Sequence, residues 1–190
     1  KKVENTWYYF EDGKMVTGWK KVKGTWYYMN EDGTMATGFI TDQSKNYYLT
    51  SSGAMVTGWK KINNTWYYFN SNGSMVTGWK KVKNVWYYMN EDGTMANGFI
   101  TDKGHTYYLT ESGAMVTGWK KINNTWYYFN ADGSMVTGWK KVKGIWYYMN
   151  ESGKMLTGWQ NVKGVQYYMN ADGKMLTGWQ KLNGTWFYMN

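Results

Sequence analysis

A repeat of 20 residues runs through almost the whole chain and constrains its fold more than any other feature. Turn glycines recur at that interval without insertion or deletion, at Gly13, Gly33, Gly53, Gly73, Gly93, Gly113, Gly133, Gly153 and Gly173. Eight full copies, each starting at a Gly–aromatic step, run from Gly18 to Thr177, with partial copies at 1–17 and 178–190. Since so short a unit cannot bury a core alone, we predict that residues 1–190 form a single repeat array, excised from a longer one.

Aromatic side chains must supply most of the buried surface of each repeat. The chain has 14 Trp, 19 Tyr and 6 Phe, and large rings bury roughly 150–250 Å² each. There is no Cys to form disulfides or to ligate zinc. No apolar run approaches the roughly 20 residues of a membrane span, so we expect no membrane insertion. Packing between repeats is therefore expected to hold the structure together.

Each repeat is predicted to contain one two-stranded hairpin. Residues 25–29, Thr-Trp-Tyr-Tyr-Met, favour a strand, residues 31–33 form a Gly turn, and residues 34–37 can return as the second strand. Residues 20–24, Lys-Lys-Val-Lys-Gly, are interpreted as an exposed connector that follows a bend at Gly18. Because helical periodicity is not evident, the expected fold class is all-β, a β-solenoid of stacked two-stranded hairpins.

The two tryptophans of a typical repeat are candidates for a binding role. In a strand alternate side chains share a face, so Trp26 and Tyr28 point one way and Tyr27 the other. Truncating a buried Trp costs about 3–5 kcal/mol, so a core position would rarely lose one. Two copies nevertheless lose both indoles, and their replacements are Phe39 with Asn46 and Phe99 with Thr106. We interpret the tryptophans as lining a cleft that these copies have lost.

The pattern Gly-Trp-Lys-Lys-x-x-x-x-Trp-Tyr-Tyr-x-Asn-x-x-Gly-x-Met-x-Thr-Gly-Trp resembles the choline-binding repeats of pneumococcal and related Gram-positive surface proteins and phage lysins. The resemblance covers the whole chain. It implies that the hairpins stack as a left-handed β-solenoid with a choline site between neighbouring repeats. It also implies that each site takes both tryptophans of one repeat, the second tyrosine of the next repeat and a nearby methionine.

Carried onto this sequence, the resemblance predicts five choline sites. They are Trp19, Trp26, Tyr48 and Met55; Trp59, Trp66, Tyr88 and Met95; Trp79, Trp86, Tyr108 and Met115; Trp119, Trp126, Tyr148 and Met155; and Trp139, Trp146, Tyr168 and Met175. Trp159 with Gln166 and Tyr188 forms a further, incomplete group. The copies that begin at Gly38 and Gly98 lack both indoles, so we expect no site there.

The chemistry of three rings suits this ligand. A quaternary ammonium donates no hydrogen bonds, and aromatic faces attract it at roughly 0.5–2 kcal/mol each. Three rings then bind no tighter than about millimolar, so strong binding needs several sites on one polymer. We expect a non-catalytic, extracellular cell-wall anchor that binds choline or phosphocholine of teichoic or lipoteichoic acid. It would need no cofactor and no nucleic acid, and self-association is left open.

Other functions remain open at this point. Related aromatic repeats in glucan-binding domains and clostridial toxin tails bind carbohydrate. A structural or adhesive rod, in which the copies with Phe39 and Phe99 contact a host protein, is a third alternative. The net charge of +9, carried by Lys pairs, favours polyanions such as wall phosphates, unless these pairs are only a solvated face.

The sequence contains few residues that could support catalysis or bind a metal ion. His105 is the single His and lies in a segment interpreted as an exposed connector. Acidic residues such as Asp32 lie in turns, with too few carboxylates in each for calcium. Any enzymatic activity is therefore expected in a domain outside this chain.

Overall fold

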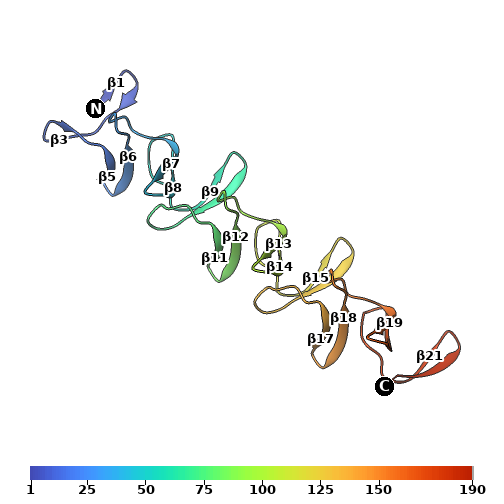
Figure 1. Cartoon of the computed structure of the whole chain (residues 1–190). Coiled ribbons are helices and arrows are strands. Elements are labelled where there is room, and N and C mark those ends of the chain that lie inside the picture. Colours follow the sequence, from blue (N-terminus) through green and yellow to red (C-terminus); the bar gives the residue numbers. More distant parts are fainter. Residues whose placement is uncertain (190) are drawn as a thin grey trace. The chain divides into compact units, whose positions relative to one another are not determined.

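The computed structural model describes residues 1–189, and every regular element in that range is a β-strand. The chain divides into two compact units, Lys1–Ala96 and Asn97–Asn190, and each is described by itself. No sheet among the described residues has more than two strands, so each unit is a series of separate hairpins (Figure 1). The predicted all-β class built from repeated two-stranded hairpins is confirmed.

The hairpins recur with constant strand lengths after the first repeat. The first unit contains β1 (Lys2–Val3), β2 (Thr6–Trp7), β3 (Phe10–Glu11), β4 (Lys14–Met15), β5 (Gly18–Val22), β6 (Thr25–Met29), β7 (Gly38–Asp42), β8 (Lys45–Leu49), β9 (Gly58–Ile62), β10 (Thr65–Phe69), β11 (Gly78–Val82) and β12 (Val85–Met89). The second contains β13 (Gly98–Asp102), β14 (His105–Leu109), β15 (Gly118–Ile122), β16 (Thr125–Phe129), β17 (Gly138–Val142), β18 (Ile145–Met149), β19 (Gly158–Val162), β20 (Val165–Met169), β21 (Gly178–Leu182) and β22 (Thr185–Met189). The structure describes no helix within residues 1–189, and so none that could cross a membrane.

The two strands of each hairpin meet at a two-residue tip. At the β15–β16 tip, Asn123 and Asn124 both have positive φ, at 45° and 65°. Positive φ at both central residues defines the type I′ turn, whose twist matches that of paired strands. Asn and Gly tolerate this conformation best, and they recur at the second tip position as Gly24, Asn64 and Asn84.

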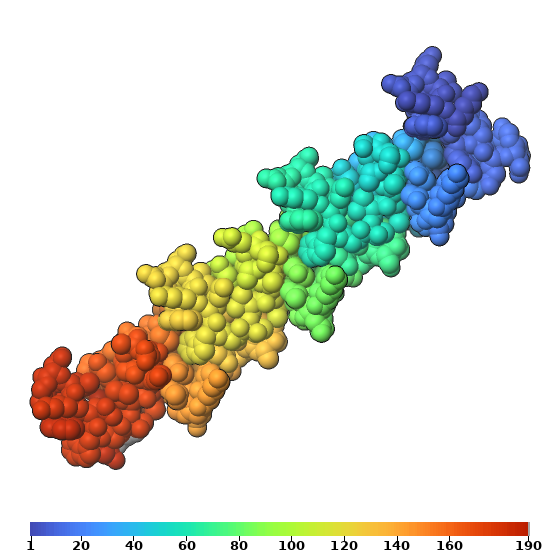
Figure 2. All heavy atoms as spheres, turned by 180° about the vertical axis from the view of Figure 1, so that it is seen from behind, coloured from blue at the N-terminus to red at the C-terminus, as the bar shows by residue number. Residues whose placement is uncertain are grey.

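In Figure 2 lobes stand out from the body of each unit, with notches between them.

The prediction that residues 34–37 supply the second strand is wrong. The partner of Thr25–Met29 is Gly18–Val22. Residues 20–22 of the segment interpreted as a connector therefore belong to the first strand, and Lys23 and Gly24 form the tip. After Met29 the chain turns through residues 30–33 and then makes a single bridge from Met29 to Met35. Lysine fits a strand here because its stem lies along a ring, which places Lys21 Nζ 5.8 Å from the ring centre of Trp26.

The first repeat is one residue shorter than the others. Trp7 lies six positions before Gly13, whereas Trp26 lies seven positions before Gly33. The deletion replaces the wider turn by a tight one, and β3 and β4 pair through Phe10 and Met15. The turn glycines keep their spacing because the missing residue precedes the first of them.

One fully buried position in most repeats forms the centre of the core. The last residue of the second strand is fully buried in seven described hairpins, as Leu49, Phe69, Met89, Leu109, Phe129, Met149 and Met169. In the first unit Phe69 packs with buried Val56 and Ile62 and with the rings of Tyr48 and Tyr67. The core is therefore thin and partly aromatic, and each hairpin depends on its neighbours for burial.

Successive repeats are joined at the bridge methionine. In the second unit Met155 N–H donates to the carbonyl oxygen of Trp126 at 2.8 Å, although 29 residues separate them. The turn glycine of the next repeat packs against the same methionine, since a Cβ on Gly173 would overlap the Met155 side chain. The turn glycine thus serves both a positive φ, +77° at Gly173, and close packing.

This double constraint predicts the cost of Gly153→Ala. The φ of Gly153 is +76° and an added Cβ would overlap Met135, so we expect a loss of about 2–3 kcal/mol in the free energy of unfolding. Gly144→Asn is the matched control, because Gly144 has no atom near its missing Cβ and Asn124 occupies the equivalent tip. We expect it to cost less than about 1 kcal/mol. Urea unfolding of the full chain measures both, and equal losses would contradict this account.

The turn carboxylates predict acid sensitivity. Asp92 Oδ1 accepts hydrogen bonds from Thr94 Oγ1 at 2.6 Å and from Thr94 N at 2.9 Å, and these bonds lower the pKa of Asp92. The pKa values of Asp32 and Asp132 are lowered by equivalent bonds. Because the folded pKa lies below the unfolded one, the unfolded chain binds more protons in acid, and this stabilisation is complete only above about pH 5.

We therefore expect the urea midpoint to fall as the pH drops below about 5 towards the lowered folded pKa values. Asp92→Asn should reduce the fall, since Asn72 makes the same bonds to Ser74 without a titrating group. The urea midpoint should be measured over a scan from about pH 5 to about pH 2. A midpoint that stays constant over this range would show that the protonation of these carboxylates does not change the stability of the fold.

Candidate functional site

Two tryptophans of one hairpin and a tyrosine of the next form a recurring aromatic cage. In the second unit Trp119 lies 6.2 Å from Trp126, centre to centre, with the two rings at 86°. Tyr147 of the following hairpin lies 4.7 Å from Trp119 at 68°. Trp119 therefore stands at a steep angle to both other rings, and the lining also includes Met155, Ala171, Asp172 and Lys174.

The same arrangement occurs four times within the two units. We call the groups cage 1 (Trp19, Trp26, Tyr47, Met55), cage 2 (Trp59, Trp66, Tyr87, Met95), cage 3 (Trp119, Trp126, Tyr147, Met155) and cage 4 (Trp139, Trp146, Tyr167, Met175). Cages 1 and 4 enclose about 300 Å³ and cage 3 about 330 Å³. These volumes suit a small organic ligand or head group rather than a folded partner.

Strand alternation explains how each cage is assembled. Trp119 and Trp126 share one face of the β15–β16 hairpin, because Trp119 pairs with Tyr128 and Lys121 with Trp126. Tyr147 lies on the opposite face of the next hairpin, where it pairs with Lys140. A cage therefore forms where the tryptophan face of one hairpin meets the other face of its successor.

One wall of the cage is open to solvent and another is buried. Trp126 is 41% exposed, whereas Tyr147 is only 9% exposed. The hydrogen bond from Met155 N–H to the Trp126 carbonyl oxygen fixes the methionine beside the open wall. The cage is thus largely preformed, and ligand entry requires no separation of hairpins.

The structure places the predicted tyrosines outside the cages. Tyr48 lies 4.9 Å from Phe39 in its own hairpin and packs towards Phe69, while Tyr47 lies 4.8 Å from Trp19. Tyr88 likewise pairs with Trp79, Tyr148 with Trp139 and Tyr168 with Trp159, each within its own hairpin. The first tyrosine of each pair replaces the second in the cage because successive residues of a strand face opposite ways.

The remaining predicted groups differ from the four cages. Trp79 lies 6.3 Å from Trp86, but Tyr108 and Met115 belong to the second unit, so that site stays a prediction. Trp159 lies 5.2 Å from Phe187, with Gln166 rather than a second indole in its hairpin.

The altered copies keep the tyrosine wall of a cage and have a phenylalanine in place of the first indole. Phe39 lies 5.3 Å from Tyr67 and is 48% exposed, and Asn46 accepts a hydrogen bond from Thr41 Oγ1 at 2.7 Å. In the second unit Phe99 lies 5.3 Å from Tyr127. Each of these junctions has a single ring where the cages have two indoles.

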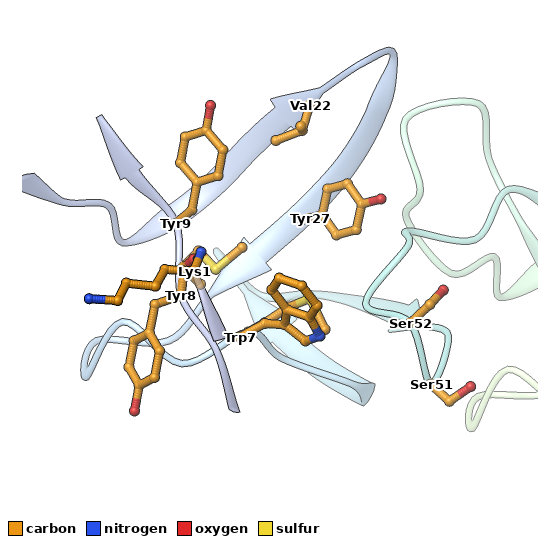
Figure 3. A pocket seen from close by; sticks show the side chains of 10 residues that line it. Lys1, Trp7, Tyr8, Tyr9, Val22, Tyr27, Ser51 and Ser52 are labelled. Carbon is orange, nitrogen blue, oxygen red and sulfur yellow. The ribbon is translucent and has the colours of Figure 1, made fainter. Parts of the chain in front are cut away.

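Sequence reasoning missed a cavity near the N-terminus. Trp7, Tyr27 and Met35 are arranged like the second tryptophan, tyrosine and methionine of a cage, and Met35 N–H donates to the Trp7 carbonyl oxygen at 2.9 Å. In Figure 3 the rings of Trp7 and Tyr27 reach the same space, with Ser51 and Ser52 beyond them. The cavity measures about 440 Å³. Trp7 could have indicated this cavity, but the one-residue deletion shifts Trp7 relative to the turn glycine and hides its match to the second tryptophan of the other repeats.

Charged groups lie behind some of the cages. Asp42 Oδ2 accepts a hydrogen bond from Trp19 Nε1 at 3.1 Å. Burial raises the pKa of Tyr28, which lies beside the same indole, and the Asp42 carboxylate raises it further. In cage 2 the junction carries a cation instead, since Lys80 Nζ lies 5.4 Å from the Tyr68 ring centre and donates to Asn70 Oδ1 at 2.8 Å.

The polar residues that could support other chemistry are dispersed. Residues 1–189 contain no cluster of three or more His, Cys, Asp or Glu side chains able to hold a metal ion. The prediction that His105 lies in a connector is wrong, because His105 begins β14 and pairs with Asp102. Its side chain is exposed, as expected.

Comparison with known proteins identifies the family of this repeat fold. A family model described as a choline-binding repeat matches residues 16–58, 56–79, 76–117, 116–157 and 156–190. A model described as a putative cell wall binding repeat matches residues 1–15. The chain therefore belongs to the choline-binding repeat family, as the sequence pattern predicted.

Three solved structures illustrate the likeness. CbpJ from Streptococcus pneumoniae TIGR4 is 34% identical over 96% of this chain and 74% of its own, with a TM-score of 0.86. Choline binding protein F from Streptococcus pneumoniae is 42% identical over 90% of this chain and 61% of its own, with a TM-score of 0.82. The choline-binding domain of CbpL from Streptococcus pneumoniae is 30% identical over 92% of this chain and 93% of its own, with a TM-score of 0.68. No curated protein sequence matched the chain.

Proposed function

We propose that this chain anchors a protein to the bacterial cell surface by binding choline groups through cages 1 to 4. The polymer would be a teichoic or lipoteichoic acid that carries phosphocholine. The chain would then act outside the cell as a non-catalytic module. Belonging to the choline-binding repeat family supports the ligand, and the cage geometry supports the mechanism.

The observation that carries the proposal is the repeated set of perpendicular aromatic walls around about 300 Å³. A trimethylammonium group presents methyl groups in several directions and has no hydrogen to donate. Rings at 84° to 87°, as between the tryptophans of cages 2 to 4, offer it two faces at once. Methionine adds a polarizable apolar contact without a competing hydrogen bond.

Repetition supplies the strength that one cage lacks. Two indoles and a tyrosine together contribute about 2–5 kcal/mol, which corresponds to millimolar affinity or weaker. Several cages that meet one choline-bearing polymer gain by effective concentration, by about 10²–10⁴ over a single site. We propose that residues 1–190 act as a single array, with the hairpins stacked as a solenoid, so that the cages are presented together.

Carbohydrate binding is less suited to these cages. A sugar ring needs an exposed flat platform with hydrogen-bonding groups beside it. The tyrosine wall of cage 3 is only 9% exposed, and the lining of cage 4 consists of three rings and a thioether. Phe39 and Phe99 are exposed single rings. A glycan or a host protein would therefore be expected to bind at the altered copies rather than at the cages.

Retention on a trimethylammonium resin tests the proposal. The chain carries a net charge of +9, so simple ion exchange repels it from such a resin. We expect the full chain to be retained all the same, and to be released by millimolar choline chloride but not by equal sodium chloride. Passage without retention, or binding to dextran that choline does not compete, would contradict choline recognition.

A further inference from the structure

Cages 1 and 3 consist of the same residue types but have opposite charges behind them. Trp19, Trp26, Tyr47 and Met55 recur 100 positions later as Trp119, Trp126, Tyr147 and Met155. Two differences change the charge behind the cage, because Ile40 and Asp42 of β7 correspond to Lys140 and Val142 of β17. At the rim, neutral Asn72 and Ser74 correspond to the oppositely charged Asp172 and Lys174. The pair is a built-in comparison of one cage in two electrostatic settings.

In cage 1 the half-buried charge is a carboxylate on the indole edge. Lys21 Nζ lies 5.8 Å from the ring centre of Trp26, but Lys21 is exposed, and water screens its charge. Asp42 is half-buried, and its Oδ2 accepts from Trp19 Nε1 at 3.1 Å. Trp19 lines the cavity, so the negative charge lies about one indole width from a bound ligand. Lys45, which pairs with Asp42 across the hairpin, is exposed to solvent, and water screens its opposing charge.

In cage 3 the nearby charge is an ammonium group. Lys140 is half-buried; its Nζ donates to Asn130 Oδ1 at 2.7 Å and lies 5.4 Å from the ring centre of Tyr128. Tyr128 in turn lies 5.1 Å from Trp119, a wall of the cage. Lys174 and Asp172 at the rim are 3.5 Å apart, so their charges largely cancel. The positive charge behind the cage remains.

These charges act on a cationic ligand directly and through the rings. A carboxylate that accepts the indole N–H increases electron density over the ring and attracts a cation across it. An ammonium group already placed over a ring of the junction repels a second cation. Neither effect acts on a neutral ligand of the same shape.

We propose that Asp42 makes cage 1 the strongest choline site of the four and that Lys140 weakens cage 3. The inference rests on the proposed function of the cages and goes beyond it by assigning affinity to residues outside the cavity lining. A unit charge at roughly 8 Å in a partly solvated site changes choline affinity about three- to ten-fold. Cage 4, with neutral Gln160 and Val162 in these positions, lies between the two, and cage 2, with Lys80, resembles cage 3.

Asp42 is thus a specificity-determining residue that acts through Trp19. The test titrates ¹⁵N-tryptophan-labelled full chain with choline and with 3,3-dimethylbutan-1-ol, in which a neutral tert-butyl group replaces trimethylammonium. The indole N–H resonances of Trp19 and Trp119 are assigned from Trp19→Phe and Trp119→Phe. The variants are Asp42→Asn, which keeps a hydrogen-bond acceptor, Asp42→Val and Lys140→Ile.

We expect choline to shift the Trp19 resonance at about three- to ten-fold lower concentration than the Trp119 resonance, and 0.5 M salt to shrink that gap. Asp42→Asn should weaken choline at Trp19 by a similar factor and leave the neutral alcohol unchanged. Lys140→Ile should strengthen choline at Trp119. Asp42→Val checks the assignment by giving cage 1 the residue of cage 3.

Two results separate this inference from the proposed function. If choline perturbs neither Trp19 nor Trp119, the cages do not bind choline and both ideas fail. If choline binds both with equal affinity, or if Asp42→Asn weakens choline and the neutral alcohol equally, the cages bind choline but Asp42 has only a structural role. The proposal on Asp42 is then overturned and the proposed function stands.

Discussion

Phe69→Ala will lower the free energy of unfolding of the first unit by about 3–5 kcal/mol, the typical loss for truncating a buried Phe. Phe69 is fully buried and packs with Val56 and Ile62, so the variant leaves a cavity between two repeats. Tyr48 and Tyr67 stack near the same ring and lose that contact too. Urea unfolding, followed by circular dichroism, measures the loss.

The matched control for this prediction is Phe69→Met. Met89 occupies the equivalent buried position of the next hairpin in the first unit, so methionine already fits the site. We expect this variant to cost less than about 1.5 kcal/mol, as for a volume-conserving change. A small loss for Phe69→Ala, or equal losses for both variants, would mean that the buried column does not hold the hairpins together.

The double variant Trp119→Phe with Trp126→Thr will remove choline binding from cage 3. It copies the Phe99 and Thr106 pattern of the altered hairpin, which the structure accommodates. Losing two indole faces at about 0.5–2 kcal/mol each weakens that cage roughly ten- to several-hundred-fold. Equilibrium dialysis with labelled choline should count one site fewer.

The adjacent cage serves as the control for the double variant. Cage 4 uses Trp139, Trp146 and Tyr167, none of which the variant changes. We expect its tryptophan resonances to shift with choline as in the unaltered chain. An unchanged count of bound choline would contradict the assignment of cage 3, whereas loss of both cages would indicate a damaged fold.

The architecture was largely predictable because the repeat imposes it. Turn glycines at constant spacing and strand-forming Trp-Tyr-Tyr runs led to an all-β chain of hairpins, as observed. The pairing within a hairpin was not predicted, because Lys20 and Lys21 resemble a solvated connector. In the structure they occupy a strand, where Lys21 lies over Trp26 and Lys20 pairs with Tyr27.

The tyrosine of each cage illustrates the limit of reading a site from resemblance. Alternation alone separates Tyr27 from Trp26 and Tyr28. If all hairpins stack in the same sense, the tryptophan face must meet the face that carries Tyr47 and not Tyr48, as the structure has it. Carrying over the second tyrosine by resemblance bypassed this geometric argument.

The contacts between side chains of neighbouring repeats could not be predicted from the sequence. The hydrogen bond from Trp19 to Asp42 joins residues 23 positions apart, and Asp42 was assigned no role from the sequence. Trp7 was hidden by a one-residue deletion. Both depend on how one hairpin lies against the next, which periodicity does not specify.

A crystal of the full chain soaked in choline tests the central claim most directly. We predict trimethylammonium density in cages 1 to 4, in cage 1 between Trp19, Trp26 and Tyr47, and none at the Phe39 or Phe99 junctions. Density beside Tyr48 or Phe39, or empty cages at saturating choline, would contradict the claim that the cages between hairpins are the binding units.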